Sequence, residues 1–221
     1  MKKNILKHCA VAGNKFNILP ARQVFPEWYK KSGKLSKELP EGQTNFISCG
    51  PFTDSFVTGY FIPLAKDVVI KTINGKKTIN VLAAPNPVLT ITSLENNPML
   101  PIPPGFSNQG YSWFTKNVLK IPKGYSALLT HPLNRYDLPF ITLSAVVDGE
   151  MVLHNGFVPM FLKEDFEGTI KAGTPIIQVI LFKTEDWDSK IDTSLHAAKE
   201  ERDKKEKSFY KKEIRKKKNY N

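Results

Sequence analysis

The chain has 221 residues, 41% of them hydrophobic, and a formal net charge of +11. This length allows one large domain with or without appendages, and the sequence contains no apolar run of about 18 residues that could cross a membrane. Two cysteines are too few for a disulfide framework, so reduced thiols in a cytoplasmic setting are expected, with Cys49 as a small buried side chain.

The first 48 residues are expected to form an N-terminal strand, a short helix and a basic loop that pack on the main domain. The opening segment MKKNILKHCAVAG begins basic, but Lys7 and His8 interrupt its apolar part. We therefore interpret it as a first strand and not as a signal peptide. Pro26 is expected to begin the helix, because proline is favoured in the first helical turn.

Residues 49–190 are expected to form a β-rich domain of the sandwich or barrel type, because their apolar segments are short and bounded by Gly, Pro and Asn. The pair Asn74-Gly75 predicts a tight hairpin turn. Residues 85–114 contain six prolines and are expected to be a functional loop, a wrapping arm or a partner contact. Strands are expected at residues 56–64, 67–73, 77–83, 119–133, 140–148, 150–162, 168–173 and 175–183.

Residues 191–221 are expected to form a basic C-terminal helix with too few apolar residues to bury a continuous stripe. From Ala197 to Asn221 there are eleven Lys or Arg and five Asp or Glu, a net +6, which leaves +5 for the preceding 196 residues. Clustered cations favour phosphate backbones or acidic proteins, whereas interleaved acids favour a solvated helix. The cations expected to bind nucleic acid are Lys204, Lys205, Lys211, Lys212, Arg215, Lys216, Lys217 and Lys218.

The densest polar cluster lies in THPLNRYDLPF, where His131, Asn134, Arg135 and Asp137 fall within seven residues. Arginine can bind an anion in a bidentate manner, asparagine can hydrogen-bond a base edge, and histidine titrates near neutral pH. Gln178 is the one polar residue in the apolar run PIIQVILF, so it must hydrogen-bond inside the sheet or face a ligand. These five residues form the candidate ligand site. The alternative is a loop held rigid by prolines.

Three further positions have a structural and a functional interpretation. Asp54 lies among apolar residues and is expected to pair with Arg22 or Arg135. Trp28 and Trp113 are expected either to stack on a base or to anchor protein contacts. His131 and His154 are not at metal-ligand spacing with any pair of cysteines or carboxylates, so neither a metal nor a cofactor is expected.

Residues 138–182, LPFITLSAVVDGEMVLHNGFVPMFLKEDFEGTIKAGTPIIQVILF, resemble the C-terminal half of the dUTPase and dCTP deaminase superfamily, which has the β-clip fold. In this resemblance Asp148 is at the position of the catalytic aspartate and Gln178 at that of a glutamine in the terminal strand. The resemblance implies a homo-oligomer, with a trimer favoured. The residues after Asp148, GEMVLHNGF, depart from the family signature, and its serine-rich phosphate-binding motif is missing. Asp148 therefore has two interpretations, a general base or a turn residue.

Nearly the whole chain resembles an uncharacterised family of large tailed bacteriophages. The resemblance lies in PARQVFPEWYK, CGPFTDSFVTGYFIPLAKDV, IPKGYSALLTHPLNRYDLPF, AGTPIIQVILFK and the closing RDKKEKSFYKKEIRKKK. It implies a phage product that acts in the infected cell or in the virion. We expect a non-enzymatic accessory protein that oligomerises and contacts nucleic acid or a protein through its tail. The alternatives are a β-clip protein that binds a nucleotide-like anion and a divergent nucleotide hydrolase.

Overall fold

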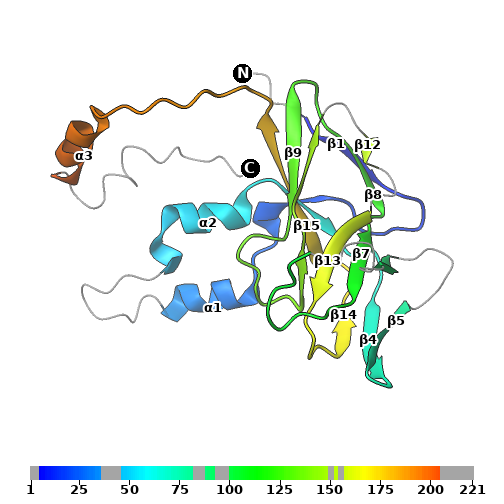
Figure 1. Ribbon diagram of the computed structural model, residues 1–221. Helices are drawn as coiled ribbons and strands as arrows, with labels where there is room; N and C mark the ends of the chain where they lie inside the picture. Colours follow the sequence, from blue (N-terminus) through cyan, green and yellow to red (C-terminus); the bar gives the residue numbers. More distant parts are fainter. Residues whose placement is uncertain are drawn as a thin grey trace.

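A computed structural model of the chain describes residues 5–35, 46–81, 88–92, 100–148, 152–153 and 157–204. This part of the chain is mainly β, with several antiparallel sheets and few helices, and it confirms the sandwich-like fold class. Figure 1 shows the sheets gathered in one body, two helices beside it, and a third helix at the end of an extended segment.

Two sheets contain most of the strands. The larger has five strands, in the order β11 (Ala145–Asp148), β9 (Tyr125–Thr130), β15 (Pro175–Lys183), β3 (Tyr60–Pro63) and β2 (Leu19–Pro20). The second has four strands, in the order β10 (Phe140–Thr142), β13 (Phe157–Leu162), β7 (Gly110–Phe114) and β6 (Leu89–Thr92).

Two three-stranded sheets complete the body. One has the order β1 (Lys7–Ala10), β8 (Asn117–Lys120) and β12 (Val152–Leu153). The other has the order β14 (Gly168–Ile170), β4 (Val68–Ile73) and β5 (Lys76–Val81). The predicted hairpin joins β4 to β5. Asn74 and Gly75 both have positive φ, 51° and 73°, as a primed two-residue turn requires.

Strand β15 lies at the centre of the five-stranded sheet, between β9 and β3. Residues 175–179 are buried, which explains the run of apolar side chains on both faces of the strand. Gly59, just before β3, has a φ of +74°, and a Cβ there would overlap the backbone carbonyl of Val179. Only glycine therefore fits where the chain passes this close to β15.

The sheets are joined by a core that includes Trp113, which is fully buried on β7. Its ring packs edge-on against Phe140, with centroids 4.8 Å apart. The indole Nε1 donates to Thr142 Oγ1 at 3.0 Å, and this hydroxyl donates to the carbonyl of Ile176 at 2.7 Å. These bonds tie β7, β10 and β15 together, so Trp113 is a core residue.

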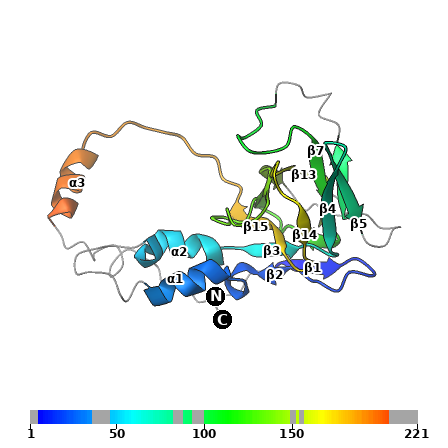
Figure 2. The ribbon, with the colours of Figure 1, turned by 90° about the horizontal axis from the view of Figure 1, so that it is seen from below.

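Helices α1 (Glu27–Leu35) and α2 (Gly50–Val57), with the 3₁₀ turns η1 (Ala21–Gln23) and η3 (Phe46–Ser48), lie beside the sheets (Figure 2). Aromatic rings fill the space between the helices. Phe56 of α2 packs against Trp28 and Tyr29 of α1, with centroids 5.7 and 5.0 Å apart. The Tyr29 hydroxyl also hydrogen-bonds the Thr53 hydroxyl at 2.9 Å.

Helix α2 corrects two expectations. A strand was expected from residue 56, but the helix continues to Val57 and β3 begins only at Tyr60. Cys49 was expected to be buried, but it is exposed at the N-cap of α2. Pro51 stands in the first turn, where it is compatible with helix initiation, and the packing of Phe56 on α1 stabilises the helix.

The two ends of the proline-rich range 85–114 lie in a sheet, since β6 and β7 pair with each other. Its residues 85–87 and 93–99 are outside the described part of the chain. No helix in the described segments is long and apolar enough to span a membrane.

After Thr184 the chain leaves the body as an extended segment that leads to α3 (Leu195–Asp203). Every residue from Thr184 to Lys204 is exposed. The expected C-terminal helix is thus present over nine residues and has no buried face. Lys199 and Asp203, four positions apart, form an ion pair of 2.6 Å on it.

Candidate functional site

The polar cluster of residues 131–137 forms the loop between β9 and β10. The loop is closed by backbone hydrogen bonds from Arg135 N to Pro132 O and from Leu138 N to Arg135 O, both 3.1 Å. Asn134 has a φ of 58°, in the left-handed region that asparagine tolerates better than most residues. The loop is therefore a compact turn, and its own backbone sets the directions of its side chains.

His131 is buried at one end of this loop and hydrogen-bonded through both ring nitrogens. Its Nδ1 accepts from the Thr142 N–H at 3.3 Å, so the proton is on Nε2, which donates to the Arg135 carbonyl at 3.1 Å. Burial lowers the pKa of His131, against a smaller opposing effect of the Arg135 carbonyl. The ring is neutral and joins β10 to the loop.

Arg135 is buried and binds Asp137 in a bidentate pair, with both N···O distances 2.9 Å. Trp28 Nε1, from α1, donates to the same carboxylate at 3.2 Å. Burial acts to raise the pKa of Asp137, but the hydrogen bonds and charge of Arg135, helped by Trp28, hold it below its usual value. The arginine fork that could bind an external anion therefore holds an internal carboxylate.

Gln178 is fully buried on β15, and its amide is hydrogen-bonded on both sides. Its Oε1 accepts from Leu133 N at 2.8 Å, and its Nε2 donates to the carbonyls of Ser55 and Thr58 at 3.0 and 2.7 Å. Asn134 Nδ2 donates to the Ser55 hydroxyl at 2.6 Å. One amide thus connects the central strand, the loop and the end of α2.

The structure therefore brings together the five residues predicted to bind a ligand. The sequence indicated the cluster within the loop, but it did not indicate that the loop contacts α2. Their described contacts lie within the protein. We call this set the polar latch: His131, Asn134, Arg135, Asp137 and Gln178. It holds the helices against the end of the sheet. It contains no nucleophile beside a base, and a ligand at Arg135 would have to displace Asp137.

The remaining candidates lie on other elements of the fold. Asp54 is buried in α2, and Arg135, one of its two expected partners, is bound to Asp137. Arg22 lies in η1, half-buried. Asp148 is exposed at the end of β11, paired through the backbone register with Ser126. No other candidate site residue lies in β11.

Of the tail cations only Lys204 lies in the described part of the chain, and it is exposed. The other seven, from Lys205 to Lys218, lie outside it, as does His154. The described residues contain no group of three or more His, Cys, Asp or Glu that could hold a metal ion.

Two pockets lie elsewhere on the body. One of about 140 Å³ is lined by the turn at residues 11–14 with Ala65, Lys66 and Lys116. A larger one of about 470 Å³ lies between the β4–β5 hairpin and residues 107–109. Neither is lined by a residue of the polar latch.

No protein-family model matches this chain, and no curated protein matches it.

Proposed function

We propose that the chain is a non-enzymatic accessory or virion-associated protein of a tailed bacteriophage. Its β-domain assembles into a homo-oligomer, a trimer by the resemblance to β-clip proteins, and its basic tail contacts nucleic acid. Its place of action is the cytoplasm of the infected cell or the virion.

The observation that supports this proposal best is the exposed segment that leads from the body to the basic tail. Residues 204–221 contain nine Lys or Arg and two Glu, a net +7. They follow a segment of which every residue from Thr184 onwards is exposed. A dense positive charge that follows an exposed segment suits the non-specific binding of phosphates, because each neutralised phosphate releases counterions.

The polar latch supports the non-enzymatic part of the proposal. Arg135 and Gln178, the most buried of the predicted ligand residues, make their hydrogen bonds inside the protein. A nucleotide-like ligand at this site would compete with the Asp137 carboxylate, which the protein itself supplies.

A gel shift with duplex DNA tests the proposal. Full-length protein should retain DNA at about 50 mM salt and release it as salt rises, and a chain ending at Leu195 should not bind. The truncated chain should melt within about 1 °C of the full-length protein, since a helix without a buried face adds little stability. Equal binding by both chains would contradict the assignment of the tail.

A further inference from the structure

The exposed segment Glu185–Asp203, which we call the C-terminal arm, carries large apolar side chains. Trp187, Ile191 and Leu195 are 84%, 93% and 64% exposed, and they follow one another at intervals of four residues. Single exposed apolar residues are ordinary on protein surfaces. A tryptophan and two aliphatic residues along one segment without a buried residue are typical of a surface that a partner covers.

The C-terminal arm is also acidic, unlike the parts of the chain on either side of it. It contains seven Asp or Glu and three Lys or Arg, a net −4, whereas residues 1–184 have twenty Lys or Arg and twelve Asp or Glu, a net +8. Three of its acids, Glu185, Asp186 and Asp188, flank Trp187. The arm therefore combines an aromatic anchor with carboxylates, and a basic aromatic surface is its complement.

The body has such a surface, formed by Phe114, Phe157, Lys66 and Lys116, which we call the acceptor patch. Phe157 is 60% exposed and packs edge-on against Phe114, with centroids 4.5 Å apart. The Lys116 ammonium lies 4.3 Å from the centroid of the Phe114 ring. Lys116 and Lys66 line the pocket of about 140 Å³, in which no acidic residue takes part.

Electrostatics at the acceptor patch favour an incoming carboxylate. Burial lowers the pKa of Lys116, and the positive charge of Lys66 lowers it further. A carboxylate placed between the two ammonium groups would offset both effects, since it favours their charged forms. Asp67, next in sequence to Lys66, has its carboxylate bound to Lys171 and to the Ala172 N–H at 2.9 and 2.8 Å.

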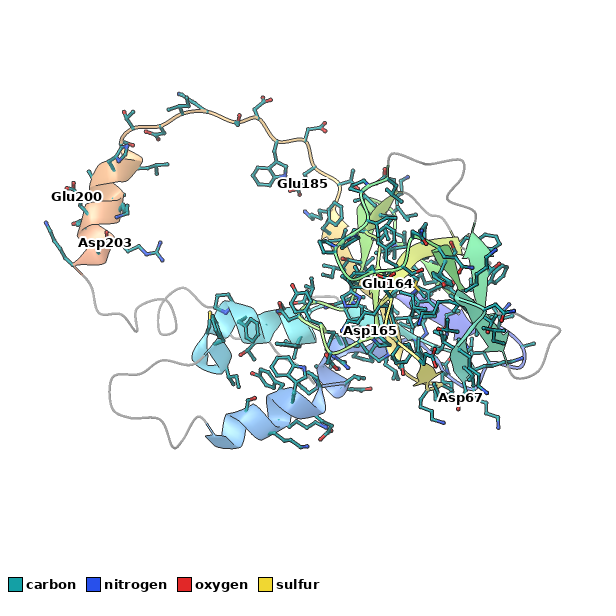
Figure 3. The ribbon with its side chains drawn as sticks, turned by 60° about the horizontal axis from the view of Figure 1, so that its bottom comes forward. Asp67, Glu164, Asp165, Glu185, Glu200 and Asp203 are labelled. Atoms are coloured by element: carbon teal, nitrogen blue, oxygen red, sulfur yellow. The ribbon has the colours of Figure 1, made fainter. Side chains whose placement is uncertain are left out.

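The arm leaves the body away from this region. Figure 3 shows Glu185, Glu200 and Asp203 along the arm on one side of the sheets, and Asp67 at the opposite end of them. Trp187 is only four residues beyond the end of β15, a span of at most about 14 Å. Because the arm and Asp67 lie on different sides of the sheets, we take a second copy of the chain as the partner that offers its acceptor patch to the arm.

We propose that Trp187 and its flanking carboxylates bind the acceptor patch of a second copy of this chain. The inference rests on the assembly part of the proposed function and specifies its contact. Because the arm and the patch are different surfaces, the contact is head-to-tail, and such contacts close into rings when the rotation between subunits allows it. A three-membered ring satisfies both proposals.

Charge reversal tests the contact in the full-length protein. Asp186→Lys with Asp188→Lys reverses the charge at two arm positions beside Trp187, and Lys66→Glu with Lys116→Glu reverses the two charges of the acceptor patch. Each pair should convert the oligomer to a monomer at about 10 µM by light scattering, a loss of at least about 100-fold in affinity for several reversed charge pairs. All four changes in one chain should restore the oligomer. The matched control, Glu200→Lys with Glu201→Lys on α3, should keep the wild-type mass.

The rescue by four changes separates disruption of the interface from failure to fold. A variant with Asp186→Lys and Asp188→Lys that keeps the wild-type mass would overturn the inference, as would a four-change variant that stays monomeric. In the first case the wild-type oligomer would still stand, and only the arm interface would fail. A wild-type monomer would contradict the assembly part of the proposed function together with the inference. In either case the gel shift still tests DNA binding by the tail, independently of the oligomeric state.

Discussion

Replacement of Gln178 by methionine tests whether the polar latch is part of the architecture. Methionine has nearly the same length and volume, so the change leaves the packing of β15 almost unaltered. It removes three hydrogen bonds, one from Leu133 N and two to the carbonyls of Ser55 and Thr58. The side chain is fully buried, so water cannot replace these bonds at the amide.

The size of the expected loss of stability follows from the number of hydrogen bonds that the replacement removes. At about 1 kcal/mol for each hydrogen bond, the free energy of unfolding should fall by about 3 kcal/mol. For a domain of this size the melting temperature should then fall by roughly 6–12 °C. Urea unfolding followed by tryptophan fluorescence measures the free energy, and thermal denaturation measures the shift.

Gln23→Met is the matched control, because Gln23 is exposed in η1 and the same chemical change should have little effect there. If the Gln178 amide served a ligand and not the fold, Gln178→Met would unfold within about 0.5 kcal/mol of the wild-type protein. That result would refute the interpretation of the latch as architecture.

Three further predictions concern the same region. Arg135→Ala should lower the free energy of unfolding, measured without ligand, by about 2 kcal/mol, because the partly exposed carboxylate of Asp137 loses its arginine partner. An unchanged melting temperature in a thermal-shift assay would favour the ligand site. Burial lowers the pKa of His131, so the unfolded chain takes up the proton first. Stability should therefore be complete above pH of about 6.5 and fall as the pH drops towards 5. Urea titrations at several pH values should show that His131→Gln removes this loss of stability at low pH, and that a change at the exposed His196, His196→Gln, does not. Gly59→Ala should unfold the protein or lower its stability by more than about 3 kcal/mol, since a Cβ at this position overlaps the Val179 carbonyl. A variant with the circular dichroism spectrum of the wild-type protein and unchanged stability would contradict this prediction.

Much of the β-domain could be predicted from the sequence because its signals are local. The β4–β5 hairpin follows from Asn74-Gly75, and β15 follows from an apolar run after a turn. Helix α2 could not be predicted in the same way. Its sequence, GPFTDSFV, has weak helix propensity, and the helix is stabilised by the packing of Phe56 on α1, which belongs to tertiary structure.

The polar latch can be predicted from the sequence only in part. The residues of the loop 131–137 stand out because they cluster in the sequence, and Gln178 stands out because a buried amide needs partners. Those partners, Ser55 and Thr58, are more than 100 positions away and give no sequence signal. The acidic arm escapes prediction for another reason. Its net negative charge is visible in the sequence, but the exposure of all its residues becomes visible only in the structure.

The salt dependence of DNA binding tests the central claim most directly. Fluorescence anisotropy would give the affinity of full-length protein for a short duplex at several salt concentrations. Five exposed body lysines, Lys7, Lys71, Lys76, Lys120 and Lys123, provide a control set for replacement by glutamine. The matched tail set is Lys211, Lys212, Lys216, Lys217 and Lys218.

We predict that the tail replacements reduce the slope of log affinity against log salt by about 0.9 for each phosphate that the protein no longer neutralises, and that the control replacements leave the slope unchanged. A slope that depends on the body lysines and not on the tail would contradict the account.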